Sequence, residues 1–158
     1  MIQCFLSMDS RYDHTKLEAS LYDSWEKSGA FEPKNNGEKT FTIMMPPPNA
    51  NDPLHIGHAI FVSIEDILIR YHRMLGEETL WLPGTDHAGI ETQFVFEKKL
   101  KKKKQSRFQF DRETLYKMIW DYVQENSNVA VDQMKKIGAS ADWSRFTFTL
   151  DEKIVDQV

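Results

Sequence analysis

The hydrophobic positions along the chain alternate between the spacing of helices and the spacing of strands. Leu17, Leu21 and Trp25 recur every four residues and predict a helix from about residue 14 to residue 28. The run Thr40–Met45 is rich in apolar residues and lies between a polar stretch and three prolines. We therefore expect a buried first strand at this point of the chain.

A long helix and a second strand follow. Between Gly57 and Leu75 the apolar residues recur at helical spacing, and Gly76 ends the pattern. The face expected to turn toward the core carries Ile60, Ile64, Ile67, Leu68, Tyr71 and Leu75. Glu78–Leu82 then predicts a second short strand. A strand, a helix and a strand in this order predict a right-handed crossover between parallel strands, and hence an α/β fold.

Further helices are predicted beyond this unit. One covers about residues 89–103, and a longer one runs from Asp111 to Ile137, with an interruption expected at Asn126–Asn128. Residues 146–150 alternate as in a strand. We divide the chain into an N-terminal extension with its helix, residues 1–37, and one α/β unit with C-terminal helices, residues 38–158.

Composition and charge narrow the class of protein. Of the 158 residues, 41% are hydrophobic and 28% are charged, as in a soluble globular domain. A formal net charge of −4 does not indicate nucleic-acid binding over the chain as a whole. No apolar run approaches the length of a membrane span, and the single cysteine, Cys4, excludes an internal disulfide and a zinc cluster. We expect a cytoplasmic protein without membrane contact.

The loop between the first strand and the long helix carries the candidate chemistry. Three consecutive prolines hold this loop extended, and His55 and His58 flank Gly57 where the helix begins. A helix N-terminus attracts anions, two imidazoles can donate hydrogen bonds to phosphate oxygens, and glycine lets a flat ligand approach the backbone. The pattern predicts a phosphate site. The alternatives are two polar residues that only start a helix, or half of a metal site that lacks a third ligand at a usual spacing.

The segment His55-Ile56-Gly57-His58 resembles the ATP-binding signature of the class I aminoacyl-tRNA synthetases. Together with Pro46-Pro47-Pro48-Asn49 and with Gly84-Thr85-Asp86-His87-Ala88-Gly89, it is similar to the valyl type within that family. The isoleucyl and leucyl types would carry tryptophan where this chain has Thr85. The resemblance extends from about Tyr12 to the end of the chain and implies a partial Rossmann-like parallel sheet.

The resemblance also implies an activity and its ligands. His55 and His58 would be catalytic and would bind the ATP phosphates, with Gly57 against the adenine. ATP would enter with Mg²⁺ as a substrate, and no metal held by the protein is expected. Valine would attack the α-phosphate and then pass to tRNA(Val). Valine, ATP and tRNA(Val) are therefore the expected partners.

Asp86 follows the second strand at its carboxyl end, where α/β sheets bind ligands. The proline loop and the Asp86 motif should therefore meet on one rim of the sheet. The resemblance implies that Asp86 and Asn49 hold the ammonium group of valine, and that Pro46 and Pro47 line one wall of its side-chain pocket. The alternative is an ordinary turn aspartate after Pro-Gly.

The sequence departs from the family pattern at Asp52 and in lacking a lysine loop, and two other functions remain open. Asp52 stands where the family usually has glycine, and a carboxylate there would repel phosphate. The chain has no Lys-Met-Ser-Lys-Ser loop and ends about where the editing insertion would start. We expect an N-terminal fragment that is inactive alone, with a separate C-terminal half as a further partner. Two other functions stay open, a free-standing nucleotidyltransferase and a non-catalytic relative that binds RNA or a protein.

The lysines within residues 98–104 are the densest cluster of charge in the chain. Lysines in such a run can contact tRNA phosphates. Lysines at the end of a helix also complement the helix dipole. We expect the second role, a solvated helix end.

Overall fold

The computed structural model of the chain describes residues 11–34 and 39–157. The chain divides into two compact units, Met1–Ala30 and Phe31–Val158. The first unit contains helix α1 (His14–Lys27), which begins where Oδ1 of Asp13 accepts a hydrogen bond of 3.1 Å from the amide of Thr15. The expected division after residue 37 stays a prediction, and Cys4 lies outside the described residues.

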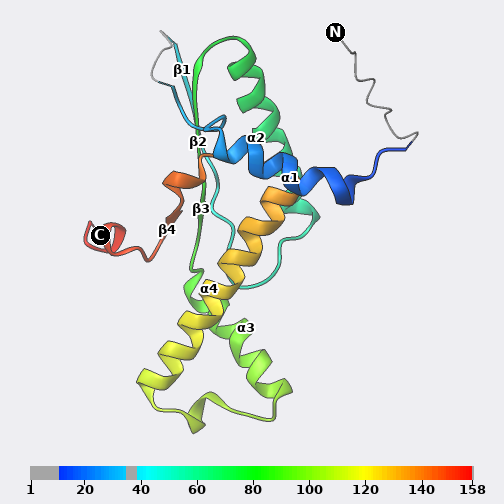
Figure 1. Cartoon of the computed structure of the whole chain (residues 1–158). Helices are drawn as coiled ribbons and strands as arrows, with labels where there is room; N and C mark the ends of the chain where they lie inside the picture. The colour runs from blue at the N-terminus through cyan, green and yellow to red at the C-terminus, as the bar shows by residue number, and fades with distance from the viewer. Residues whose placement is uncertain (1–10, 35–38, 158) are drawn as a thin grey trace, which may run out of the picture. The chain divides into compact units, whose positions relative to one another are not determined.

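The second unit begins with the predicted strand, helix and strand. Strands β1 (Thr40–Met44) and β2 (Glu78–Leu82) pair in parallel, from Thr40 opposite Glu78 to Met44 opposite Leu82. Helix α2 (Ile56–Met74) connects them and lies against both strands (Figure 1). This confirms an α/β fold with parallel strands.

A second, separate pair of parallel strands is formed by residues that follow β2. β3 (Gly84–Thr85) pairs with β4 (Thr147–Phe148). The backbone of Gly84, which directly follows Pro83, takes part in this ladder. A Cβ at Gly84 would lie 2.7 Å from the carbonyl oxygen of Thr147, so only glycine lets the two strands approach this closely.

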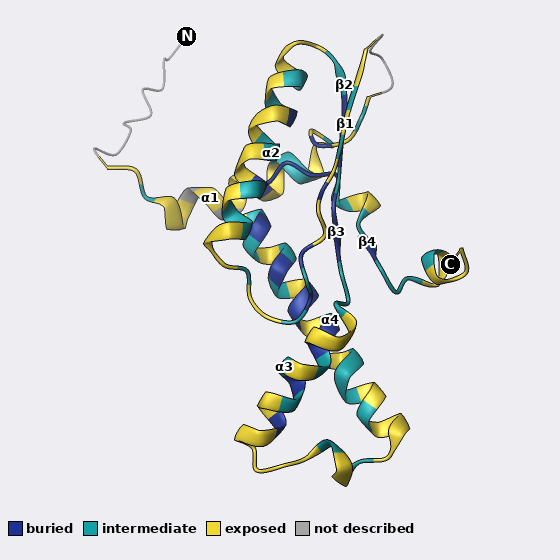
Figure 2. Ribbon diagram, turned by 180° about the vertical axis from the view of Figure 1, so that it is seen from behind, coloured by how far each residue is buried: buried dark blue, intermediate teal, exposed yellow. Residues whose placement is uncertain are grey.

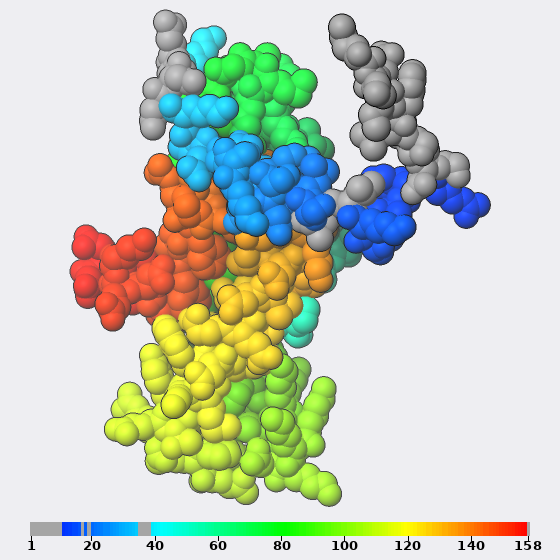
Figure 3. All heavy atoms as spheres, in the orientation of Figure 1, coloured from blue at the N-terminus to red at the C-terminus, as the bar shows by residue number. Residues whose placement is uncertain are grey.

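Two helices form a hairpin beyond the strands (Figure 1), and their atoms form the green and yellow part at the bottom of Figure 3. They are α3 (Gly89–Lys102) and α4 (Arg112–Lys136), joined through a 3₁₀ turn at Arg107–Gln109. The interruption expected at Asn126–Asn128 is wrong, because α4 is continuous. Asn126 donates to the carbonyl of Tyr122 at 2.8 Å, so its amide is satisfied within the helix.

The end of the chain adds two short elements, and no described helix could cross a membrane. A 3₁₀ turn at Trp143–Arg145 precedes β4, and the short helix α5 (Glu152–Val155) follows it. Within the described part of the chain, no helix combines the length and the apolar character of a membrane span.

The main core lies where α2, the first two strands and the end of α4 meet (Figure 2). Its fully buried residues are Met45, Val62, Ile69, Trp81, Met134, Ala139 and Ala141. The expectation that β1 is buried is only half right. Its residues alternate between exposed and half-buried, and Met44 is 75% exposed, because successive strand residues point to opposite faces.

The predicted core face of α2 is wrong. The six apolar residues expected to face inward are all exposed, and Val62 and Ile69 are buried instead. Apolar periodicity fails here because the inner face of α2 carries charged side chains that find hydrogen bonds. The indole Nε1 of Trp81, for example, donates to Glu65 at 2.9 Å.

Candidate active site

The two histidines form a reciprocal cap at the start of α2. His55 is the N-cap residue, and its Nδ1 accepts a hydrogen bond of 3.1 Å from the amide of Gly57. In return, Nδ1 of His58 accepts from the amide of His55 at 3.2 Å. This is the geometry of a capping box, with imidazoles in place of the usual hydroxyl and carboxylate.

The cap fixes where each ring carries its proton. An Nδ1 atom that accepts a hydrogen bond carries no hydrogen, so in this cap each ring has its N–H group at Nε2. Partial burial lowers the pKa of His58, and the proximity of His55 lowers it further. The ring centroids are 4.1 Å apart, so the two imidazoles lie next to each other at the helix start.

The position of the His55 ring in the cap requires glycine at position 57, even without a ligand. A Cβ at position 57 would lie 2.9 Å from Cε1 of His55, a contact that would push the ring away. The cap also uses the amide of Gly57, one of the free backbone groups that we expected to attract phosphate. An anion at this helix start would therefore have to be recognised mainly by the two imidazoles.

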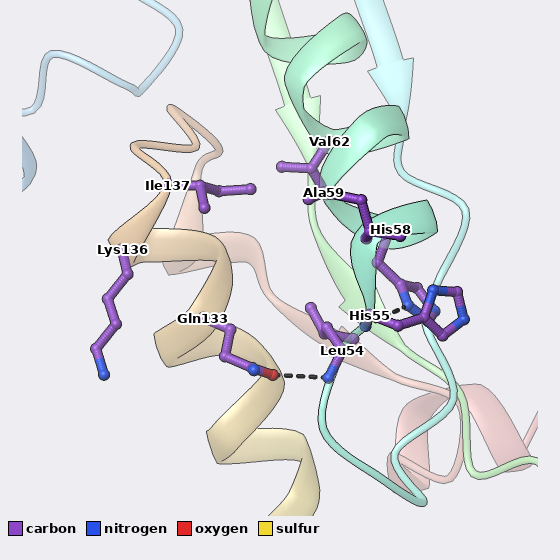
Figure 4. A pocket seen from close by; sticks show the side chains of 9 residues that line it. Leu54, His55, His58, Ala59, Val62, Gln133, Lys136 and Ile137 are labelled. Carbon is purple, nitrogen blue, oxygen red and sulfur yellow. Dashed lines mark hydrogen bonds between the residues drawn. The ribbon is translucent and has the colours of Figure 1, made fainter.

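A cavity of about 370 Å³ lies between the start of α2 and the end of α4. It is lined by Leu54, His55, Ile56, His58, Ala59, Val62, Gln133, Lys136 and Ile137. The rings of His55 and His58 lie together on the side of α2 away from Lys136 and Ile137 (Figure 4). The imidazole pair therefore presents its donors to the proline-loop side of the helix.

Helix α4 holds the proline loop in place. Gln133 accepts a hydrogen bond of 2.7 Å from the amide of Leu54, directly before the histidines. The hydroxyl of Tyr122 donates to the carbonyl of Asn51. Ala50 is fully buried against Val123 of the same helix. These three anchors preorganise the loop, and neither Tyr122 nor Gln133 was identifiable as an anchor from sequence.

The proline loop and the Asp86 motif meet, as the sequence predicts. Asn49 and Asp86 form a parallel backbone bridge. The amide of Ala50 donates to the carbonyl of Asp86 at 2.7 Å, and the amide of Asp86 donates to the carbonyl of Pro48 at 2.9 Å. The roles of Asn49 and Asp86 toward a ligand remain predictions.

We call the region where the proline loop and the Asp86 motif meet the corner. Two side chains that the sequence did not indicate, Thr149 and Glu91, form hydrogen bonds with Asp86 and Asn49 there. Thr149 donates its hydroxyl hydrogen to Oδ1 of Asp86 at 2.9 Å, and Nδ1 of His87 lies 3.3 Å from the same oxygen. Asn49 donates to Oε2 of Glu91 at 2.8 Å. Glu91 therefore holds the side-chain amide of Asn49 at the point where the backbone of Asn49 bridges to that of Asp86. The alternation of residues 146–150 was the only sequence signal near Thr149.

The other predicted site residues lie on the surface. Pro46, Pro47 and Asp52 are exposed, and Pro47 lies against Gly84. The lining of the large cavity includes neither Pro46, Pro47, Asn49 nor Asp86. Pro46 and Pro47, which the resemblance implies line one wall of the amino-acid pocket, are thus open to solvent. Within residues 11–34 and 39–157, no three metal-binding side chains are grouped to hold an ion.

Comparison with known proteins identifies the family. Residues 20–158 match the model of the class I tRNA synthetases (I, L, M and V). A valine–tRNA ligase of Treponema denticola is 43% identical over 155 residues, which cover 97% of this chain and 17% of the relative. The ligase of Pelagibacter ubique is 45% identical over 150 residues, covering 95% and 17%, and that of Legionella pneumophila strain Lens is 48% identical over 145 residues, covering 92% and 16%.

A solved structure supports the fold. The LeuRS of Agrobacterium radiobacter, in a ternary complex described as LeuRS-tRNA-LeuAMS, superimposes with a TM-score of 0.73. It covers 92% of this chain and 17% of its own, at 20% sequence identity. The chain thus spans 16–17% of the length of the relatives named here. The family model, the histidine cap and the Asn49–Asp86 bridge lead to one conclusion: the chain belongs to the class I tRNA synthetases (I, L, M and V), and valine–tRNA ligases are among its relatives.

Proposed function

We propose that this chain supplies the ATP-binding and amino-acid-binding corner of a valine–tRNA ligase. The observation that carries the proposal is the reciprocal cap, which leaves the Nε2–H groups of His55 and His58 free to donate to phosphate oxygens. The names of the relatives support valine as the amino acid. A cytoplasmic location accompanies this proposal, because translation consumes the charged tRNA there.

The proposed reaction has two steps. A carboxylate oxygen of valine attacks the α-phosphorus of ATP, the bond to the bridging oxygen of the β-phosphate breaks, and pyrophosphate leaves. The valyl group then passes from the adenylate to a terminal hydroxyl of tRNA(Val), and AMP leaves. Little covalent chemistry is required from the protein, so positioning and stabilisation of charge account for the rate.

Each part of the corner has a role in the first step. The imidazole donors stabilise the charge that builds on the phosphate oxygens, and magnesium enters with ATP as part of the substrate. The carboxylate of Asp86 accepts a charge-assisted hydrogen bond from the ammonium of valine. Asn49 adds its carbonyl oxygen, because its amide nitrogen already donates to Glu91. Because Gly57 has no side chain, the adenine can approach the backbone at the start of α2.

Selectivity for valine follows from shape at the proline wall. Pro46 and Pro47 present small, rigid apolar surfaces that suit a branched three-carbon side chain. One additional methylene is worth about 1–3 kcal/mol in such a pocket, so isoleucine is rejected by steric conflict. Threonine has nearly the same shape as valine and is not rejected by such a wall.

A titration with a stable analogue of the adenylate tests this proposal. Valyl-sulfamoyl adenosine replaces the labile phosphate linkage and carries both halves of the ligand. We expect calorimetry to detect its binding to the chain, and we expect the leucyl analogue to bind more weakly. Asp86→Asn should cost about 1.5–3 kcal/mol of binding free energy, because the isosteric amide removes the charge. Equal affinity for the two analogues, or an unchanged affinity of Asp86→Asn, would contradict the proposal.

A further inference from the structure

His87 is held in place through both of its backbone groups. Its amide donates a hydrogen bond of 2.9 Å to the hydroxyl oxygen of Thr149, and its carbonyl accepts one of 2.6 Å from the hydroxyl of the buried Thr92. The next residue, Ala88, adopts the left-handed conformation with a φ of 51°, which is uncommon for a residue other than glycine. Backbone strain of this kind concentrates at functional sites. The ring of His87 therefore starts from a fixed backbone position beside the candidate site.

Three polar groups converge on the hydroxyl oxygen of Thr149. They are the amide of His87 at 2.9 Å, Nδ1 of His87 at 2.8 Å and Oδ1 of Asp86 at 2.9 Å. A hydroxyl group has one hydrogen to donate and two lone pairs that accept. The backbone amide can only donate, so it takes one lone pair, and an ionised carboxylate can only accept. One hydrogen and one lone pair of the hydroxyl therefore remain for Asp86 and Nδ1 of His87.

Only one tautomer of His87 satisfies all three contacts. If Nδ1 carried no hydrogen it would be an acceptor, and the single hydroxyl hydrogen could reach either Nδ1 or Asp86 but not both. With hydrogen on Nδ1, the ring donates to the second lone pair and the hydroxyl donates to Asp86. Nδ1 also lies 3.3 Å from Oδ1 of Asp86, a contact that is favourable only when Nδ1 carries hydrogen. His87 is therefore the Nδ1–H tautomer, the opposite of His55 and His58 in the cap.

These hydrogen bonds distinguish the two carboxylate oxygens of Asp86. Oδ1 accepts from the hydroxyl of Thr149 and lies beside Nδ1 of His87. No hydrogen bond from a described residue reaches Oδ2. The side chain of Asp86 is 34% exposed, so the carboxylate is accessible to a ligand. Oδ2 is thus the oxygen that can accept hydrogen bonds from outside the protein.

We propose that His87 is a positioning residue for amino-acid binding. Through the hydroxyl of Thr149, it fixes Oδ1 of Asp86 and leaves Oδ2 for the ammonium group of the substrate. This inference rests on the proposed function, in which Asp86 binds that ammonium group. With Nδ1–H in place, the hydroxyl of Thr149 can donate only to Asp86. Without this donor the hydroxyl is less restricted, and binding must then order the carboxylate, which lowers the affinity.

The far side of the imidazole lies in a mostly apolar environment. A Cβ at Gly89 would lie 3.8 Å from Nε2 of His87, and no described residue forms a hydrogen bond with that nitrogen. His87 lines a cavity of about 110 Å³ whose other walls are Gly89, Thr92, Tyr116, Ile119, Trp120, Val123 and Leu150. An apolar side chain at position 87 would therefore be accommodated, so the hydrogen bond can be removed without burying an unpaired polar group.

Nuclear magnetic resonance tests the tautomer directly. The chain has five histidines, and a long-range ¹H–¹⁵N correlation spectrum with ¹⁵N-labelled histidine distinguishes Nδ1–H rings from Nε2–H rings. The spectrum is recorded without ligand, above the pH range in which free imidazoles titrate. His87→Asn removes one set of signals and thereby assigns it. We expect Nδ1–H at His87 and Nε2–H at His55 and His58, and an Nε2–H ring at His87 would overturn the inference.

Two variants of similar shape test the role in binding. Asparagine and leucine have similar branched side chains, but only asparagine can donate a hydrogen bond to Thr149. We expect His87→Asn to keep the affinity for valyl-sulfamoyl adenosine within about twofold and His87→Leu to weaken it at least about fivefold. Affinity for magnesium–ATP should not change in either variant. Tyr116→Phe, in the wall of the same cavity, is the control, and unfolding curves establish that each variant is folded.

The outcomes separate this inference from the proposed function. Equal affinities of the asparagine and leucine variants for the analogue would overturn the positioning role of His87, and so would an equal loss of ATP and analogue binding in folded His87→Leu. Failure of the unaltered chain to bind the analogue would contradict the proposed function instead. The ligand-free spectrum depends neither on analogue binding nor on the folding of His87→Leu, so it decides the tautomer in every case.

Discussion

The hydroxyl of Thr149 donates a hydrogen bond of 2.9 Å to Oδ1 of Asp86, from a position 63 residues further along the chain. The same hydroxyl oxygen accepts from the amide of His87 at 2.9 Å. Thr149 therefore connects the carboxylate of Asp86, which we propose binds the amino acid, to the backbone amide of His87. The orientation of Asp86 depends on a residue just after β4.

Thr149→Val should weaken binding of the valyl analogue without weakening binding of ATP. The exchange keeps the branched shape and removes the hydroxyl, so Asp86 loses the bond that orients it. We expect a loss of about 0.5–1.5 kcal/mol in calorimetry. Thr149→Ser should retain most of the affinity, and Thr147→Val, two residues earlier in β4, is the control. Equal losses for valine and ATP ligands would mean that Thr149 only stabilises the fold.

Gly57→Ala should destabilise the chain even without a ligand. The added Cβ would lie 2.9 Å from Cε1 of His55, so the ring must leave its capping position. Loss of a helix cap typically costs about 0.5–2 kcal/mol, which chemical denaturation can detect. If stability were unchanged and only ATP affinity fell, Gly57 would serve the ligand alone, as the sequence resemblance implies.

The sequence predicted two kinds of feature well: secondary structure set by local apolar spacing, and residues that belong to recognisable motifs. Apolar spacing predicted β1, α2 and β2, and strand order predicted that Asn49 and Asp86 would meet. Apolar spacing failed for the face of α2, because it cannot anticipate that charged residues such as Asp66 find partners in the core. Thr149 and Gln133 were missed because they reach the site only through tertiary contacts.

Glu65→Ala should destabilise the fold by about 1–3 kcal/mol, because it leaves the buried indole N–H of Trp81 without an acceptor. Burial raises the pKa of Glu65, and the hydrogen bond from Trp81 partly offsets that effect. Glu65→Gln keeps an acceptor and removes the charge, so its free energy of unfolding at pH 7 should equal or exceed that of the unaltered chain. Glu125→Ala, exposed on α4, is the control. A loss for Glu65→Gln as large as that for Glu65→Ala would show that the charge itself is needed.

The stability of the chain should depend on the neutral form of His58. Its pKa in the folded chain lies below the ordinary value of 6.5, so the unfolded chain binds more protons between the two values. The stabilisation is fully present above about pH 6.5 and is lost as the pH falls through the folded pKa. His58→Gln keeps an acceptor for the amide of His55 but does not titrate. The free energy of unfolding should therefore fall less steeply below pH 6.5 in this variant, and parallel curves would contradict the assignment.

The most direct test of the central claim is calorimetric titration of the chain with magnesium–ATP. The double variant His55→Ala with His58→Ala removes both Nε2–H donors, and His14→Ala, at an exposed position in the first unit, is the control. Unfolding curves recorded in parallel establish that each variant is folded. Our account predicts a loss of about 1.5–3 kcal/mol of binding free energy for each charge-assisted hydrogen bond removed, and no change for the control. An unchanged affinity for ATP in a folded double variant would contradict it.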